Sequence, residues 1–256
     1  MSTILVTGGT GNLGVLVVGM LREQGHEVRA LSRSSAEFPV DLRDGSGLDA
    51  ALAGAQVVVH CASSPRGGDD VAARHLIDAA RRAGTVTNLV YISIVGVDVV
   101  PLGYYRTKLR VERMLEDSGL GVTILRTTQF HDLVARVTGA AARLPLPVVP
   151  LPKGVRVQPV AVEEVADRLA ELAVPEAAGR VPDVGGPEAR PLEEWAGVWL
   201  AATGSRRRVL GVPLAGRAYA ACRRGGILAA PGRAVGRITF DDYVERRGRV
   251  RGTGRA

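Results

Sequence analysis

The sequence predicts an α/β fold built on a doubly wound parallel sheet, with a smaller carboxyl-terminal lobe. Short apolar runs alternate with helix-length amphipathic segments over the first 143 residues, the order typical of a parallel sheet covered on both faces. A glycine-rich turn joins the first apolar run to the first amphipathic segment. Hydrophobic residues make up 46% of the 256-residue chain, enough for a substantial core.

The expected strands are short and apolar, and the expected helices lie between them. The strands are Thr3–Thr7, Glu27–Leu31, Gln56–Cys61, Asn88–Ser93 and Gly121–Arg126, with a further short one near Phe38–Val40. The helices are Leu13–Gln24, Leu48–Ala53, Asp70–Ala83, Tyr104–Ser118 and Phe130–Ala142. Glycine follows several of these helices, as at Gly25 and Gly84, where a residue with positive φ commonly ends a helix.

The pattern changes after residue 143. The segment Leu144–Pro152 is too rich in proline for a helix or a central strand, so we expect an extended loop over the carboxyl edge of the sheet. Helices are predicted at Val160–Val174 and Glu193–Thr203. We therefore divide the chain into a domain of residues 1–143 and a lobe of residues 144–256, which is integrated with it and faces the substrate. The arginine-rich end of this lobe is expected to be mobile.

Composition and charge exclude several classes of protein. No apolar run is long enough to span a bilayer, and the first residues lack a basic, apolar leader, so we expect a cytoplasmic protein without membrane partners. Two distant cysteines indicate no disulfide framework. The net charge of +7 comes largely from late arginines, and no helix-turn-helix or zinc pattern accompanies them, so we do not expect nucleic acid as a partner. The histidines show no metal-ligand spacing. Monomer and homo-oligomer both stay open.

The glycine-rich turn predicts a dinucleotide site. Gly8 permits a tight turn, Gly11 lets backbone N–H groups approach a pyrophosphate at the positive end of the helix, and Gly14 lets the helix pack closely against the strand. The residues expected to contact the nucleotide here are Gly8, Thr10, Gly11, Asn12, Leu13 and Gly14. An ordinary structural turn is the alternative, but the strand before it and the helix after it favour nucleotide binding.

The end of the second strand indicates which dinucleotide is bound. Sites for NAD usually place Asp or Glu about 20 residues beyond the glycines, to bind the ribose 2′-hydroxyl. Here the strand ends in Ser32 and Arg33, which suit a 2′-phosphate. We therefore expect NADP(H) as the cofactor, against the alternative that Arg33 is a solvated loop residue. Asp41 is expected near the adenine.

These residues resemble the short-chain dehydrogenase/reductase superfamily, in particular its extended and atypical NmrA-like NAD(P)-binding members. The resemblance runs over roughly residues 3–185, through the G-x-x-G-x-x-G turn and the segments Tyr104–Lys108, Leu125–Phe130 and Gln158–Val162. It implies a Rossmann-like fold. It also implies nucleotide contacts at Arg33, Asp41, Leu42, Ala62 and Ser63.

The resemblance further implies a catalytic pair. Tyr104 and Lys108 lie one helical turn apart, so they share a face of the helix. In the family, the tyrosine exchanges a proton with the substrate oxygen, and the lysine favours the phenolate and holds the ribose of the nicotinamide. Ser93 is either the residue that orients the substrate oxygen or a plain strand-end serine. Extended members often carry the active serine one place later, where this chain has Ile94.

The leading hypothesis is an NADP(H)-dependent reductase or dehydrogenase acting on a carbonyl or alcohol of a small, mainly apolar compound. We expect Gln129, Phe130 and His131 to line its substrate pocket, because they follow the strand that passes the nicotinamide end of such a site. The alternative is an NADP(H)-sensing regulatory protein that binds the cofactor without turnover. Ile94 and the late arginines motivate that alternative.

Overall fold

The computed structural model describes residues 1–64, 67–174 and 176–252, so the last residues of the arginine-rich tail lie outside the described part. The chain forms two compact units, and it passes between them several times. The first unit holds Met1–Asp98, Leu102–Arg126 and Val165–Pro182, and the second holds Val99–Pro101, Thr127–Glu164 and Asp183–Ala256. The helix that precedes residue 143 thus groups with the second unit, whereas residues 165–182 return to the first.

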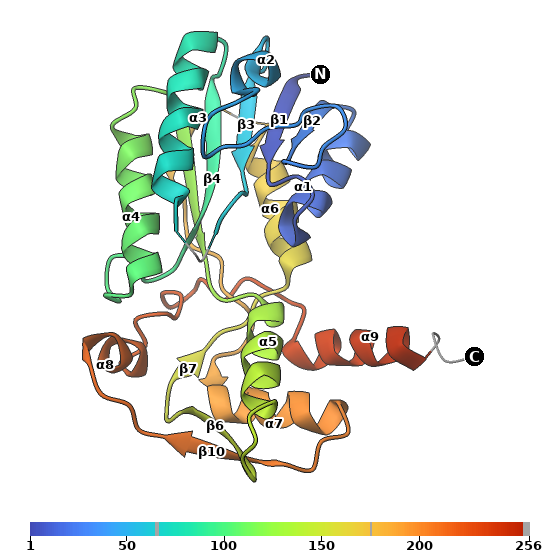
Figure 1. Cartoon of the computed structure of the whole chain (residues 1–256), viewed down its shortest axis with the longest axis vertical. Coiled ribbons are helices and arrows are strands. Elements are labelled where there is room, and N and C mark those ends of the chain that lie inside the picture. The colour runs from blue at the N-terminus through green and yellow to red at the C-terminus, as the bar shows by residue number, and fades with distance from the viewer. Residues whose placement is uncertain (65–66, 175, 253–256) are drawn as a thin grey trace. The chain divides into compact units, whose positions relative to one another are not determined.

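The first unit is built on a six-stranded sheet (Figure 1). In spatial order its strands are β2 (Glu27–Leu31), β1 (Thr3–Thr7), β3 (Val57–His60), β4 (Asn88–Ile94), β5 (Val122–Thr127) and β8 (Gly179–Arg180). β1 pairs in parallel with both β2 and β3, and β3 pairs in parallel with β4. The doubly wound α/β prediction and its five main strands are confirmed.

The strand expected near Phe38–Val40 is wrong. This segment forms only an isolated bridge between Ser32 and Pro39. Pro39 has no backbone N–H to donate, and Val40 makes a single bond, from its N–H to the Ser32 carbonyl at 3.1 Å. The β8 strand, only two residues long, is too short to predict from an apolar pattern.

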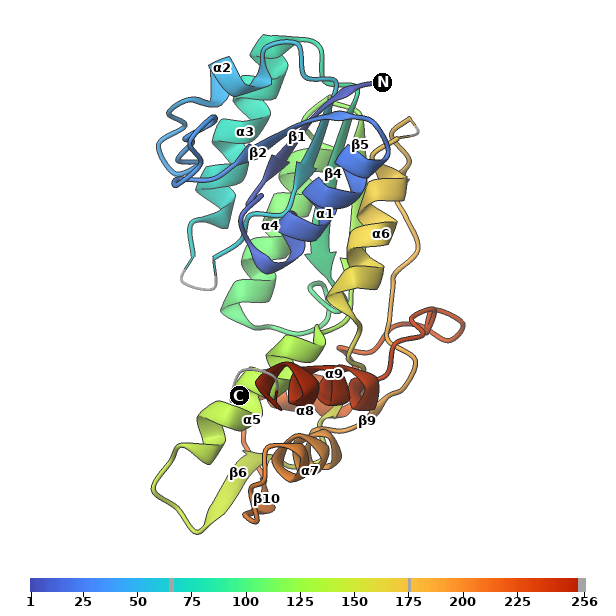
Figure 2. The ribbon, with the colours of Figure 1, turned by 90° about the vertical axis from the view of Figure 1, so that its right-hand side faces the viewer.

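Helices cover both faces of the sheet (Figure 2). On one face lie α1 (Asn12–Glu23) and α6 (Val162–Leu172), and on the other lie α2 (Leu48–Leu52), α3 (Asp69–Ala83) and α4 (Gly103–Glu116). The core on the second face is a continuous cluster in which Leu52, Leu76, Leu89 and Leu115 are at most 1% exposed. Burial of this apolar stripe on each helix fixes the helices against the sheet.

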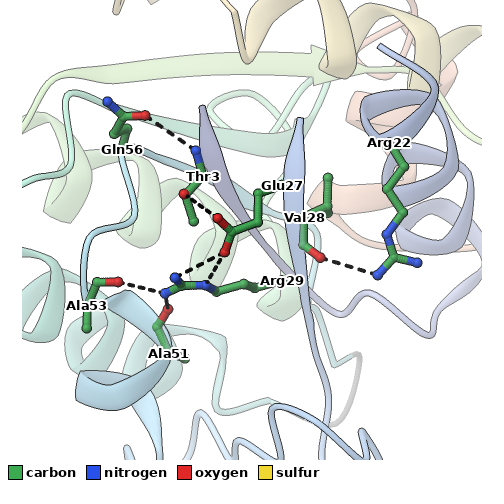
Figure 3. A network of polar contacts seen from close by, with 8 residues as sticks. All are labelled: Thr3, Arg22, Glu27, Val28, Arg29, Ala51, Ala53 and Gln56. Atoms are coloured by element: carbon green, nitrogen blue, oxygen red, sulfur yellow. Dashed lines mark hydrogen bonds and ion pairs between the residues drawn. The ribbon is translucent and has the colours of Figure 1, made fainter. Parts of the chain in front are cut away.

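A polar network holds the amino ends of β1 and β2 together (Figure 3). Thr3 donates its hydroxyl to Glu27 at 3.0 Å, and Arg29 donates to the same carboxylate at 3.2 Å. Arg29 also donates to the carbonyls of Ala51 and Ala53, at 2.8 and 2.7 Å. These carbonyls end α2 and have no helical partner, so the guanidinium serves as their cap. The network stabilises the sheet at the edge opposite the strands' carboxyl ends.

The second unit contains shorter elements. They are α5 (His131–Ala142), β6 (Val148–Pro152), β7 (Arg156–Val157), β9 (Arg190–Pro191), α7 (Leu192–Ala202), β10 (Arg208–Val212), α8 (Arg217–Arg223) and α9 (Phe240–Gly252). β6 pairs in parallel with β10, and β7 pairs antiparallel with β9. No helix in the described part of the chain is long and apolar enough to cross a membrane.

The loop expected at Leu144–Pro152 is wrong in its second half, where β6 forms. A two-stranded sheet has only edge strands, and an edge strand tolerates proline because its outward N–H needs no partner. Arg207 accounts for the first half, since its guanidinium donates to the carbonyls of Ala142, Leu144, Leu146 and Val148. A single arginine thereby supplies donors to a segment whose own pairing partners are few.

Candidate functional site

The turn between β1 and α1 has room for glycine alone at two positions. Gly8 has a φ of +67°, and a Cβ there would lie 2.9 Å from the backbone of Ala62, two residues after β3 ends. A Cβ on Gly14 would lie 2.1 Å from the Gly8 carbonyl oxygen. Gly11 is the N-cap residue of α1 and uses no side chain to cap it. The first backbone N–H groups of a helix have no partner within the helix, so the start of α1 is a suitable place for an anion.

A cavity of about 900 Å³ lies beside this turn, at the carboxyl ends of β1, β2 and β3. Nine predicted cofactor residues line it, namely Gly8, Thr10, Gly11, Ser32, Arg33, Asp41, Leu42, Ala62 and Ser63. Asn12, Leu13 and Gly14 belong to the first turn of α1 and are absent from the lining. The volume lies in the upper part of the range for cofactor sites.

Two guanidinium groups border the cavity. Arg33 is exposed at the end of β2, and no acidic side chain of the described residues forms an ion pair with it. Arg43 is a lining residue that the sequence reasoning missed. Its backbone N–H donates to Asp41 at 2.9 Å, and its guanidinium donates to the Gly67 carbonyl at 3.5 Å. The position of Arg43, two residues after Asp41, is the signal that could have found it.

Tyr104 and Lys108 lie on one face of α4, close to the wall of the cavity. The Tyr104 hydroxyl lies 2.7 Å from the hydroxyl of Ser63, which lines the cavity. Lys108 is 3% exposed, and its ammonium donates to the Ile92 carbonyl at 3.3 Å. The ammonium also lies 4.8 Å from the centre of the Tyr91 ring and 6.0 Å from that of Tyr104. Predicted cofactor and catalytic residues are thus brought together.

Asp69 is the second residue that the sequence reasoning missed. It begins α3 and is 5% exposed. The Ser63 hydroxyl donates to its Oδ2 at 2.6 Å, the Ser64 N–H donates to its Oδ1 at 2.7 Å, and Lys108 Nζ lies 3.9 Å from Oδ2. The sequence signal for Asp69 was an aspartate at the start of a helix, directly after two glycines. An aspartate in that place usually stabilises the helix end at the protein surface, so the pattern alone did not indicate a site.

The electrostatics keep both members of the pair protonated at neutral pH. Burial lowers the pKa of Lys108 to about 8, and the Asp69 carboxylate acts in the opposite direction. Burial also raises the pKa of Tyr104. The lysine was expected to favour the phenolate, whereas burial of the phenol is the largest influence on the pKa of Tyr104 and favours the protonated form. A protonated Tyr104 is suited to donate a proton to a substrate oxygen.

Two titratable side chains at and just after the end of β3 are uncharged at neutral pH. His60 is 1% exposed and lies 2.7 Å from the Thr7 hydroxyl, and burial lowers its pKa to about 3. Burial raises the pKa of Cys61 to about 12, so its thiol is not ionised at neutral pH. Neither group supplies a base or a thiolate nucleophile there.

Ser93 lies near the end of β4, which extends through Ile94, one residue beyond the expected boundary. Its side chain is 1% exposed, and its hydroxyl has no hydrogen-bond partner among the described residues. A buried hydroxyl without a partner is uncommon. The position is compatible with either interpretation of Ser93.

Gln129, Phe130 and His131 belong to the second unit and do not line the cavity. Gln129 donates to the Ile227 carbonyl at 3.2 Å. His131 is 2% exposed and packs against the rings of Phe240 and Tyr243, with ring centres 5.7 and 5.2 Å away. Burial lowers the pKa of His131 to about 4. Their role in a substrate pocket stays a prediction.

Metal ligands are not assembled in the part of the chain that the structure describes. Residues 1–64, 67–174 and 176–252 contain no group of three or more His, Cys, Asp or Glu side chains that could hold an ion.

Comparison with known proteins gives one family match and several partial relatives. A family model described as NAD(P)H-binding matches residues 8–173. An uncharacterised protein of Mycobacterium tuberculosis is 35% identical over 176 residues, which are 65% of this chain but only 19% of that protein. Quinone oxidoreductase 2 of Escherichia coli is 32% identical over 142 residues, which are 50% of this chain and 49% of that relative. The chain thus matches about half or less of these relatives' lengths.

Solved structures share the fold over nearly the whole chain. An NADPH-dependent quinone oxidoreductase of Escherichia coli, complexed with NADPH, has a TM-score of 0.81 at 21% identity and covers 95% of this chain and 99% of its own. A UDP-glucose 4-epimerase of Thermotoga maritima has a TM-score of 0.74 at 19% identity, over 98% of this chain and 99% of its own.

Proposed function

Because the chain belongs to the NAD(P)H-binding family, we propose that it is an NADP(H)-dependent oxidoreductase that reduces the carbonyl group of a small, mainly apolar compound. The observation that carries the proposal is the pair Tyr104 and Lys108. The two residues lie one helical turn apart beside the cavity at the glycine-rich turn, and both are protonated at neutral pH. The similarity to a quinone oxidoreductase over half of the chain supports quinones as the first substrates to test.

The lining residues fit a phosphorylated dinucleotide. The start of α1 suits the pyrophosphate because backbone N–H groups at a helix start favour an anion. Gly8 and Gly14 permit this tight turn, since a Cβ at either position would collide with neighbouring backbone. Arg33 has no acidic partner among the described residues, and its planar guanidinium can bind a 2′-phosphate with two hydrogen bonds. Arg43 adds a second positive charge on the wall of the same cavity.

When bound, NADPH would supply the hydride for the carbonyl carbon. Tyr104 donates its hydroxyl proton to the carbonyl oxygen as negative charge develops there, so the product is an alcohol. Lys108 then lowers the energy of the resulting phenolate, because its ammonium lies near the Tyr104 ring. We propose that the unpartnered hydroxyl of Ser93 donates a hydrogen bond to the same substrate oxygen.

Turnover tests this proposal. The protein is incubated with NADPH and a panel of quinones, ketones and aldehydes, and nicotinamide absorbance is followed. Tyr104→Phe should lower kcat by roughly 100-fold or more while NADPH binding persists, since only the transferable proton is removed. Tyr105→Phe is the matched control, because the adjacent Tyr105 is 9% exposed in the core. Undiminished turnover in Tyr104→Phe contradicts the assignment.

A second candidate function is an NADP(H) sensor without turnover. Ile94 stands where extended short-chain dehydrogenases often carry a serine, and Ser93 itself is 1% exposed. Tight NADPH binding without turnover on the whole panel would favour the sensor over the reductase.

A further inference from the structure

Asp69 is a buried carboxylate that faces both members of the proton-donating pair. It accepts hydrogen bonds from the Ser63 hydroxyl and the Ser64 N–H, and the Lys108 ammonium lies 3.9 Å away. At 5% exposure a carboxylate is costly to bury unless donors and an opposite charge surround it, as they do here. The adjacent Asp70 differs, because it pairs at the surface with Arg110.

The hydrogen bonds around Ser63 determine where each proton lies. An ionised carboxylate can only accept, so the single hydroxyl proton of Ser63 is donated to Asp69 at 2.6 Å. The Ser63 oxygen then has only lone pairs to offer to Tyr104, 2.7 Å away. Tyr104 must therefore be the donor in that hydrogen bond.

We propose that Asp69 is a positioning residue that fixes Tyr104 as a hydrogen-bond donor and holds the Lys108 ammonium beside it. The proton stays on the Tyr104 oxygen and is directed to the neutral Ser63 oxygen until a substrate oxygen replaces Ser63 as the acceptor. This inference deepens the proposed reductase function and rests on it for its catalytic meaning. The arrangement of Asp69, Ser63, Tyr104 and Lys108 can itself be measured without turnover.

Asp69 is the carboxylate best placed to act on Lys108. The titratable groups that face Lys108 come from four elements and the segment after β3, and they are His60, Cys61, Asp69, Tyr91, Tyr104 and Glu112. Among these the carboxylates are Asp69 and Glu112. Glu112 is engaged by Arg126, whose guanidinium donates to both of its oxygens, at 2.8 and 2.6 Å.

The test uses the fact that the chain has only two lysines, Lys108 and Lys153. Protein labelled with ε-¹³C lysine gives two signals, which Lys153→Arg assigns, and each is titrated without cofactor. The Lys108 signal should titrate at about pH 8 in the wild type. In Asp69→Asn it should titrate about one to three pH units lower, because an opposite charge within 4–6 Å is removed. Asp70→Asn, the matched control, should leave it in place.

Two results would overturn the proposal: a Lys108 titration that Asp69→Asn leaves unchanged, or one that Asp70→Asn moves equally. If Asp69→Asn fails to fold, Asp69→Glu replaces it. That variant retains the charge and should keep the Lys108 titration near pH 8, whereas a fall of one pH unit or more contradicts the inference.

The pH profile of turnover tests the direction of the Tyr104 hydrogen bond. The side-chain amide that Asp69→Asn introduces can donate to Ser63, which frees the Ser63 proton for Tyr104 and favours the phenolate. The alkaline limb of kcat/KM should then move to lower pH, whereas a uniform loss at every pH contradicts the proposal. A shifted lysine titration in a protein with no turnover supports the positioning role of Asp69 and counts against the reductase function alone.

Discussion

Replacing Lys108 by methionine should change the pH dependence of stability in a defined direction. Burial lowers the pKa of Lys108 from 10.5 to about 8 in the folded chain. Between these values the unfolded chain holds the proton and the folded chain does not, so wild-type stability rises with pH across this window. The whole difference corresponds to about 3 kcal/mol.

Methionine fills a similar volume and does not titrate, so Lys108→Met lacks this rise. The gap, defined as the unfolding free energy of the variant minus that of the wild type, should fall by about 2 kcal/mol between pH 7 and pH 9.5. The pH dependence of the gap is the test, because Asp69 loses its ammonium neighbour in the variant and its desolvation alters the gap at any single pH.

Urea titrations of both proteins at several pH values measure the gap. Lys153→Met is the matched control, since it removes an exposed lysine. A gap for Lys108→Met that varies with pH no more than the gap for Lys153→Met would refute the conclusion that Lys108 is held as a desolvated cation.

Two further predictions follow from close contacts in the first unit. Gly14→Ala should abolish NADPH binding in a calorimetric titration, because its Cβ would lie 2.1 Å from the Gly8 carbonyl oxygen. The control is Gly139→Ala on α5, where a Cβ meets open space, and this variant should bind NADPH normally. Glu112→Gln should lower the free energy of unfolding by roughly 3 kcal/mol, because it removes the buried carboxylate partner of the 5%-exposed Arg126 and leaves it paired with the more exposed Asp98. Urea midpoints within experimental error of the wild type would contradict this second prediction.

The nucleotide half of the site could be predicted from the sequence because it depends on local pattern. A strand, a glycine turn and a helix follow one another within a few residues, and the end of the neighbouring strand supplies Arg33. Predicting that these features meet in one site requires only the rule that the carboxyl ends of parallel strands lie at the same edge of the sheet. The strands and helices of the first unit were predictable for the same reason, since each buries one apolar stripe.

The missed features depend on contacts between distant parts of the chain. Asp69 gains its role only because α3 brings it within reach of Lys108 on α4, and an aspartate at a helix start usually has a simpler reason to be there. The β6 strand, in a proline-rich segment, depends on β10, some sixty residues later along the chain, and on the carbonyl contacts of Arg207. A pattern read along the sequence carries no signal for either pairing.

The most direct test of the account is a comparison of NADPH and NADH binding to the wild type and to Arg33→Ala. Because Arg33 lines the cavity at the end of β2 without an acidic partner among the described residues, we expect the wild type to bind NADPH more tightly than NADH. Arg33→Ala should weaken NADPH by about 10-fold or more, as the loss of a charge-assisted hydrogen bond implies, and should leave NADH nearly unchanged. Equal losses for both cofactors, or no binding of either by the wild type, would contradict the account.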